Sequence, residues 1–328
     1  MRLARHPSRR LAAIAATLLA VTAGPAFAQP SDGLRERLYD WSDGVLVVAH
    51  RACHAPAPSR GMDRVAPENS LAALDRCVAL GVDMVEIDVR RTADGALVIL
   101  HDATVDRTTD GHGRVSEMTL AQVQALRLKG SDANEAPPTL EAFLAHAQGR
   151  ILINLDVKEP IAEQVAQVVL DSEAAGQVLV KARPEAGAAP MADLPAYRSL
   201  AFMPMVGSVK GRALGAPADV AAMQVMAENR IPAIELCDLR RSEFKAVRAQ
   251  ARLSRVRLWS NALARKGFKG VVARARAGGA AADGRVTWRR LIDDGVSVIQ
   301  TNRPAALLDY LDARGLRGAA RPVVNAAL

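Results

Sequence analysis

The chain has 328 residues, of which 24% are charged and 3% are aromatic, and its formal net charge is +8. The first 28 residues hold four arginines and no acid, so the rest of the chain carries only +4. This modest excess does not indicate a nucleic-acid-binding protein. Beyond the N-terminus, no run is long and apolar enough to predict a membrane span.

Residues 1–28 have the pattern of a secretory signal peptide. A basic start is followed by the apolar run LAAIAATLLAVTA, which is too short to span a bilayer, and then by the small-residue cleavage pattern at Ala26–Ala28. We expect cleavage near Gln29 and a periplasmic or secreted protein, with an uncleaved anchor as the alternative. A Sec signal is favoured, because SRRLAAI matches the twin-arginine pattern only in part.

Eight apolar runs rich in Val, Ile and Leu alternate with helical stretches, as strands buried on both faces should. The predicted strands are 45–50, 84–89, 151–157, 177–182, 200–206, 233–237, 256–261 and 296–302. The predicted helices are 68–81, 139–149, 161–176, 216–230, 241–253 and 287–295.

One further apolar run, residues 96–102, is separated from the strand before it by only the five residues RTADG. Parallel strands need a longer crossover, so these residues predict an antiparallel hairpin. The remaining alternation predicts a (β/α)8 TIM barrel that forms a single domain over residues 29–328. The alternative is an open doubly wound sheet, but no glycine-rich fingerprint follows the first strand. We expect 105–138 to be an insertion over the barrel mouth, and 275–284 to be a surface loop.

Acidic residues lie where these strands end. Glu86 and Asp88 are two residues apart on one strand, so their side chains share a face, and Asp156 and Lys158 repeat this spacing on the next strand. Three inward carboxylates repel one another unless a cation compensates them, and oxygen ligands favour Ca²⁺ or Mg²⁺. The alternative is a structural ion-pair network with the nearby basic residues Arg51, Arg90 and Lys158.

Two histidines, His50 and His101, end apolar runs beside this cluster and suit general acid–base chemistry. Arg51 and Lys158 offer the cations that bind phosphate oxygens. Other polar candidates flank the same strand ends: Trp259 and Asn261 for substrate contact, Glu68 to orient His50 or Arg51, and Asn69 as a helix cap. Together these groups predict phosphoryl transfer or phosphodiester cleavage.

The ordered motifs resemble the glycerophosphodiester phosphodiesterase family. They are VVAHR, APENS, VEIDV, TADG, VILHD, DRTT, PTLEAFL, NLDVK, LWSN and IQTNRP, within residues 45–312. The resemblance implies a TIM barrel that hydrolyses glycerophosphodiesters to glycerol 3-phosphate and an alcohol with a divalent cation, Ca²⁺ or Mg²⁺. It implies His50 and His101 as the acid–base pair and Arg51 and Lys158 as phosphate contacts. The implied metal ligands are Glu86, Asp88 and Asp156. Attack by the substrate's own hydroxyl, giving a cyclic intermediate, and attack by water both stay open.

The chain departs from that family pattern in three places. Ala52 replaces the usual glycine and precedes the long segment CHAPAPSRGMDRV, Asp156 stands where many members have Glu, and Lys181 stands where many have serine. Two other functions remain as alternatives: a sphingomyelinase D-like phospholipid phosphodiesterase, and a non-catalytic phosphodiester-binding protein of the periplasm. The sequence indicates no oligomeric state. Cys53 and Cys77 either form a disulfide or are small buried side chains.

Overall fold

The computed structural model describes residues 30–130, 134–183, 195, 198–209, 212–213, 231–263 and 284–318. The predicted signal peptide, the predicted helix 216–230 and nearly all of the predicted loop 275–284 lie outside this part of the chain. Within it, no helix has the length and apolarity that crossing a membrane would require.

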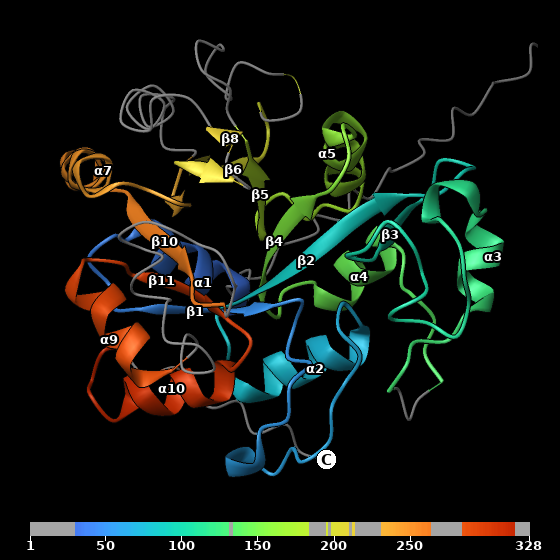
Figure 1. Ribbon diagram of the computed structural model, residues 1–328, viewed down its shortest axis with the longest axis horizontal. Coiled ribbons are helices and arrows are strands. Elements are labelled where there is room, and N and C mark those ends of the chain that lie inside the picture. Colours follow the sequence, from blue (N-terminus) through green and yellow to red (C-terminus); the bar gives the residue numbers. More distant parts are fainter. Residues whose placement is uncertain are drawn as a thin grey trace, which may run out of the picture.

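Eight parallel strands close into a barrel, which confirms the predicted (β/α)8 fold (Figure 1). In chain order they are β1 (Leu46–His50), β2 (Met84–Arg91), β4 (Leu152–Val157), β5 (Val178–Ala182), β6 (Ala201–Val206), β9 (Ala233–Leu236), β10 (Arg257–Asn261) and β11 (Val298–Thr301). Strand β1 pairs with both β11 and β2, and this double pairing removes the sheet edges. Each strand coincides with one of the predicted apolar runs.

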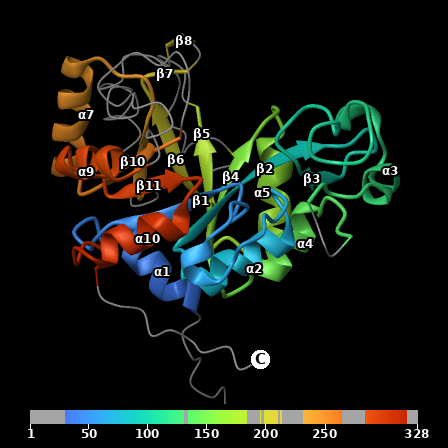
Figure 2. The same ribbon diagram turned by 60° about the horizontal axis from the view of Figure 1, so that its bottom comes forward.

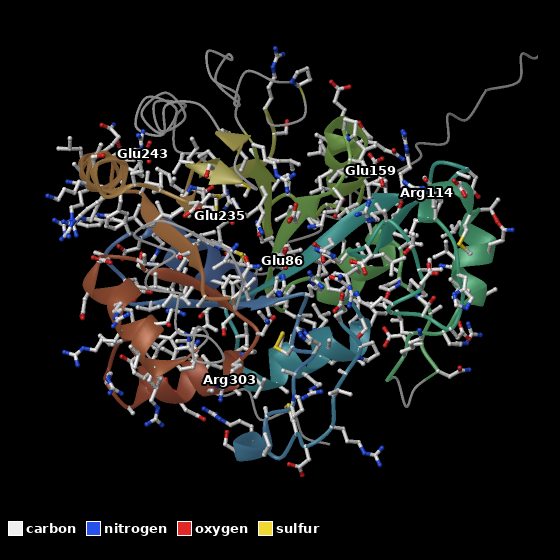
Figure 3. The ribbon with its side chains drawn as sticks, viewed as in Figure 1. Glu86, Arg114, Glu159, Glu235, Glu243 and Arg303 are labelled. Atoms are coloured by element: carbon white, nitrogen blue, oxygen red, sulfur yellow. A yellow bond between two sulfur atoms is a disulfide. The ribbon has the colours of Figure 1, made fainter. Side chains whose placement is uncertain are left out.

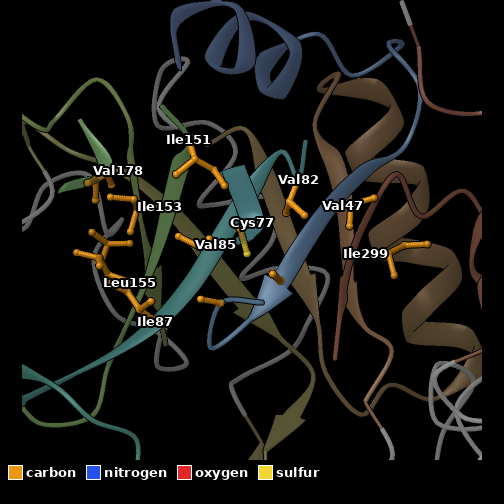
Figure 4. Packing of buried hydrophobic residues seen from close by; sticks show 14 of the residues in the cluster. Val47, Cys77, Val82, Val85, Ile87, Ile151, Ile153, Leu155, Val178 and Ile299 are labelled. Carbon is orange, nitrogen blue, oxygen red and sulfur yellow. The ribbon is translucent and has the colours of Figure 1, made fainter. Parts of the chain in front are cut away.

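Helices surround the barrel (Figure 2). They are α2 (Leu71–Leu80), α4 (Leu140–Ala147), α5 (Ala162–Asp171), α7 (Arg241–Leu253), α9 (Arg285–Asp293) and α10 (Pro304–Asp312). Outward side chains of the strands, such as Val47, Val85, Ile153 and Ile299, form the main core (Figure 4). The helices cover this apolar face, as the continuous apolar runs predict.

The inner face of the barrel changes character along the strands. Leu46, Met84, Leu152 and Trp259 belong to a separate buried cluster inside the barrel. Because side chains alternate, the inward positions further along the same strands fall to polar residues. Glu86 is one of these, two residues beyond Met84.

A short N-terminal helix, α1 (Pro30–Tyr39), which the apolar pattern did not predict, covers the amino end of the barrel. Its Leu34 and Leu38 join the inner cluster. Arg257 of β10 is 1% exposed and donates to several main-chain carbonyls of α1 and the turn that follows it. One end of the barrel is therefore closed by packing and hydrogen bonds, and the site lies at the other end.

The predicted hairpin is also confirmed. Strand β3 (Leu97–Ile99) pairs antiparallel with β2, with Val89 opposite Ile99. Beyond it lies an insertion with a small core of its own, which contains η2 (Val115–Glu117) and α3 (Leu120–Ala125). Figures 1 and 2 both place α3 to the side of the barrel, past β2 and β3.

The loop after β1 is fastened to the barrel wall. Cys53 and Cys77 form a disulfide between this loop and α2, so the structure favours the bonded alternative, whereas Cys237 is buried and unbridged. The loop continues through η1 (Pro58–Arg60), and a two-stranded piece, β7 (Ser208–Val209) with β8 (Arg212–Ala213), follows β6.

Candidate active site

The three predicted acids meet at the carboxyl ends of β2 and β4. Register places Asp88 beside Asp156 and Glu86 beside Asn154. One carboxylate oxygen from each of Glu86, Asp88 and Asp156 lies within 4.8 Å of the others, and all three residues are buried. Figure 3 shows Glu86 near the centre of the barrel. A compact set of oxygen donors fits a hard divalent cation.

Two lysines, the half-buried Lys158 and the buried Lys181, belong to the same cluster. Lys158 Nζ lies 2.7 Å from both Asp88 Oδ1 and Asp156 Oδ2. Lys181 Nζ lies 3.4 Å from Glu86 Oε1 and 3.8 Å from Asp156 Oδ2. Burial raises the pKa of Glu86, and Lys181 only partly offsets this effect. Burial opposes ionisation of Asp156 too, but Lys181 and Lys158 outweigh it and hold its pKa well below the usual range. Ion pairs thus coexist with the ligand geometry for a cation.

Asn69 holds Asp88 in place. Its backbone is left-handed, with φ of 60°, and its Nδ2 donates to Asp88 Oδ2 at 2.9 Å. Its Oδ1 accepts the Asp88 main-chain N–H at 3.3 Å. The predicted capping role of Asn69 is wrong, because Ser70 caps α2 by accepting from the Ala73 N–H. The left-handed turn starts the helix one residue later and leaves Asn69 facing the acids.

His50 ends β1 with one ring nitrogen engaged. Its Nδ1 lies 2.8 Å from Asn302 Oδ1, just after β11, so Nδ1 carries the proton and Nε2 is the basic atom. Burial, together with the nearby Arg51 charge, lowers the pKa of His50 to about 3. The imidazole is therefore neutral near pH 7, with Nε2 as its unprotonated ring nitrogen.

His101 has an acidic partner instead. Its Nδ1 lies 2.6 Å from Asp102 Oδ1, and its main-chain carbonyl accepts twice from Arg90, at 3.0 and 2.7 Å. Burial lowers the pKa of His101, while Asp88 and Asp102 act in the opposite direction. An imidazolium formed here would be stabilised by Asp102.

Glu68 joins the loop after β1 to the insertion. It accepts from Arg51 at 3.0 Å and from Arg107 at 2.7 and 2.9 Å. Arg107 also donates to Asp102, at 2.5 Å. Burial opposes ionisation of Glu68, but the two guanidinium groups outweigh it and lower its pKa to about 2. A chain of charged hydrogen bonds therefore runs from Arg51 to the partner of His101.

The other two predicted substrate contacts, Trp259 and Asn261, lie on β10 inside the barrel. Trp259 is fully buried inside the barrel, and its indole N–H donates to Asn261 Oδ1 at 2.9 Å. Asn261 donates in turn to Glu235 Oε1 at 2.7 Å, and Glu235 Oε2 lies 3.6 Å from Lys181 Nζ. Trp259 thus packs below the mouth rather than offering an exposed surface, and Asn261 is the half-buried member of the pair.

Several contributors were not assigned from the sequence: Asp102, Arg107, Glu235 and Asn302. Three of them lie within motifs of the family pattern: Asp102 in VILHD, Arg107 in DRTT and Asn302 in IQTNRP. The motif order was the available signal, but it carries no information on which side chain each residue meets.

Comparison with known proteins relates part of the chain to a phosphodiesterase family. Residues 42–193 match the Glycerophosphoryl diester phosphodiesterase family, and residues 202–311 match a family described only as a domain of unknown function. The family predicted from the motifs is confirmed for residues 42–193. A glycerophosphodiester phosphodiesterase of Caldanaerobacter subterraneus subsp. tengcongensis is 40% identical over 121 residues, which are 35% of this chain and 46% of that relative. The chain thus matches about half the length of this curated phosphodiesterase relative.

Solved structures share the fold over most of the chain. A glycerophosphoryl diester phosphodiesterase from Parabacteroides distasonis superposes with a TM-score of 0.64 and 23% identity, over 87% of this chain and 92% of that one. An Oleispira antarctica phosphodiesterase, solved with its product sn-glycerol-3-phosphate, gives a TM-score of 0.55 and 18% identity, over 82% of this chain and 97% of that one. At such identities, these likenesses establish the barrel alone.

Proposed function

We propose that this phosphodiesterase-family protein hydrolyses glycerophosphodiesters to glycerol 3-phosphate and an alcohol. The observation that carries the proposal is the pair of imidazoles beside the buried acids. His50 and His101 each have Nδ1 held, by Asn302 and Asp102 respectively, which leaves both Nε2 atoms for proton transfer. The curated Caldanaerobacter relative, named a glycerophosphodiester phosphodiesterase, supports the same substrate class.

The different partners of the two histidines suggest different roles. Asn302 is a neutral amide and leaves His50 a neutral base, which accepts the proton of the attacking hydroxyl. Asp102 is ionised and stabilises a protonated His101, which returns a proton to the leaving alcohol oxygen. The nucleophile is either the glycerol hydroxyl of the substrate or a water molecule, and both routes need the same pair.

A divalent cation, Ca²⁺ or Mg²⁺, would be held by Glu86, Asp88 and Asp156, and when bound it would supply Lewis-acid stabilisation of phosphoryl charge. Arg51 and Lys158 are the proposed phosphate contacts. Both side chains already pair with carboxylates in the structure: Arg51 with Glu68, and Lys158 with Asp88 and Asp156. A bound phosphate would therefore share the guanidinium and the ammonium with these carboxylates.

We also propose that the enzyme works in the periplasm or outside the cell. The basic and apolar start of the sequence supports export. The Cys53–Cys77 disulfide supports an oxidising compartment, since disulfides are rare in reducing ones.

The function is tested by glycerol 3-phosphate release from glycerophosphocholine and glycerophosphoglycerol, with and without chelator. We expect His50→Asn and His101→Asn each to lower kcat about 10²–10⁴-fold, the usual size of an acid–base contribution. His112→Asn is the matched control, because His112 is 84% exposed in the insertion. Binding without turnover would indicate a phosphodiester-binding protein, and turnover of choline lipid vesicles alone would indicate a phospholipid enzyme. Full rates in either active-site variant would refute the acid–base pair.

A further inference from the structure

A cleft of about 400 Å³ opens between the loop after β1 and the insertion. Its walls include His54, Val65 and Pro67 on the loop side and Arg107 and Lys129 on the insertion side, with Glu68 between them. We propose that this cleft holds the leaving alcohol and selects alcohols that bear an anionic group, a carboxylate or a phosphate. The proposal rests on the phosphodiesterase function proposed above.

The cleft adjoins the groups that would handle the leaving oxygen. Glu68, one of its walls, accepts from Arg51, the proposed phosphate contact, at 3.0 Å. Arg107, another wall, donates to Asp102, which holds His101 Nδ1. An alcohol protonated by His101 therefore leaves on the side where the cleft lies. Glu68 connects this cleft to Arg51, and Arg107 connects it to Asp102.

The wall contributed by the loop is preformed. This loop is the long segment in which the chain departs from its family, and the Cys53–Cys77 disulfide fixes its start. Arg76 of α2 donates to the main-chain carbonyls of Ala55 and Arg64, each at 2.8 Å. A cleft with such a fixed wall has a definite size and shape, so it can discriminate among alcohols.

The charge of the cleft is positive. Arg51 and Arg107 are balanced by Glu68 and Asp102 through the contacts described above. Lys129 is exposed, and in the described part of the chain its ammonium donates to the Asp106 main-chain carbonyl, at 2.6 Å. The Asp106 carboxylate instead accepts from the Gly113 N–H at 3.2 Å and faces His112. Among the residues that the structure describes, no carboxylate forms an ion pair with this ammonium.

The lining also disfavours a quaternary ammonium group. Such groups are recognised by aromatic side chains, and among the described residues the cleft has no Phe, Tyr or Trp in its walls. Its one acid, Glu68, is already bound by two guanidinium groups. Choline would thus meet a positive wall without an aromatic face, whereas an anionic head would gain Lys129.

Three substrates that differ in the charge of the alcohol test this proposal: glycerophosphocholine, glycerophosphoglycerol, and glycerophosphoglycerol phosphorylated on its second glycerol. The measurement is kcat/KM from glycerol 3-phosphate release, at low and at high salt. We expect the wild-type protein to favour the phosphorylated substrate over the choline substrate about tenfold or more, and this ratio to fall as salt screens the cleft. Lys129→Glu is expected to lower the ratio at least tenfold, and Lys129→Met to give an intermediate ratio.

Lys245→Glu is the matched control, because Lys245 is an exposed lysine on α7. Its ratio is expected to equal that of the wild type. Thermal unfolding of all variants shows that each is folded. Equal rates on the three substrates, or a ratio unmoved by Lys129→Glu, would overturn the proposed selectivity while leaving the phosphodiesterase function in place. Absence of turnover on all three by the wild-type protein would instead reject the function itself.

Discussion

Replacement of Lys181 by methionine tests how the buried ammonium affects cation binding. Lys181 is 8% exposed, and its Nζ lies 3.4 Å from Glu86 Oε1 and 3.8 Å from Asp156 Oδ2, both atoms of proposed ligands. Methionine keeps an unbranched side chain of similar length but carries no charge. We expect Lys181→Met to bind Ca²⁺ and Mg²⁺ more tightly than the wild-type protein.

The distances set the size of the effect. A cation lies about 2.3 Å from a ligand oxygen, so it would lie at most about 6 Å from Nζ. Repulsion between charges of +2 and +1 at about 6 Å comes to roughly 5 kcal/mol with an effective dielectric constant of about 20. Side-chain relaxation and water that enters the site reduce this repulsion. We therefore expect a gain of about 10- to 100-fold in affinity, equivalent to roughly 1.4–2.8 kcal/mol.

Glu235 requires a second variant. Its Oε2 lies 3.6 Å from Lys181 Nζ, so Lys181→Met leaves the buried Glu235 carboxylate without its ammonium partner. This unpaired carboxylate would by itself attract a cation. Lys181→Met/Glu235→Gln removes both charges and is expected to bind the cation more weakly than the single variant. Lys245→Met, on the exposed surface of α7, is the matched control and should leave the affinity unchanged.

Calorimetric titration of the chelator-treated proteins with Ca²⁺ and with Mg²⁺ measures these affinities without reference to turnover. Circular dichroism checks that the variants remain folded. A folded Lys181→Met protein with unchanged or weaker affinity would show that this ammonium does not oppose the cation, and the electrostatic reasoning above would fail.

Asn69→Ala should weaken cation affinity about tenfold in the same titration, because Asp88 loses the side chain that fixes it and a lost buried hydrogen bond costs about 1–3 kcal/mol. Asn69→Gly, which tolerates the left-handed backbone, should weaken the affinity equally. Wild-type affinity in both variants would show that Asn69 does not position Asp88 for the cation. Arg257→Met should lower the free energy of unfolding in urea by about 3 kcal/mol, because main-chain carbonyls of α1 lose their donor. Arg252→Met, at an exposed position, should leave this free energy unchanged. Equal stabilities of the two variants would show that Arg257 does not hold α1 against the barrel. His50 has a pKa of about 3, below its unfolded value of 6.5, so its contribution to stability is present above pH 6.5 and is lost as the pH falls towards 3. His50→Asn should flatten this decline in the free energy of unfolding. Wild-type unfolding curves that are identical at pH 7.5 and pH 5 would contradict this expectation.

The barrel and most of its site could be predicted because they depend on local patterns. Continuous apolar runs identify strands buried on both faces, and five residues are too few for any connection but a hairpin. The spacing of Glu86 and Asp88, and of Asp156 and Lys158, determines a shared inward face once the strands are known. Parallel register then brings the acids together, which the structure shows with Asp88 opposite Asp156.

The remaining contacts depend on backbone detail and on distant segments. Asn69 has a sequence context that suits a helix cap, but a left-handed φ of 60° moves the cap to Ser70 and turns Asn69 to Asp88. Helix α1 has little apolar content, and it is held by Arg257, more than 200 residues away in the chain. Neither the backbone conformation of Asn69 nor the contact of α1 with Arg257 can be predicted from the residues that are adjacent in the sequence.

The contacts of the second half of the chain also explain why the motifs alone do not define the site. Residues 202–311 match a family described as a domain of unknown function, and strands β9, β10 and β11 from this range close the same sheet as β1 and β2. Asn302 from this half orients His50, and Glu235 of β9 pairs with Lys181 of β5, two strands away. Because a closed barrel brings its last strand against its first, the proton-accepting atom of His50 is set by a residue 252 positions later. The chemistry proposed for residues 42–193 therefore requires the second half, because that half supplies the partners of His50 and Lys181.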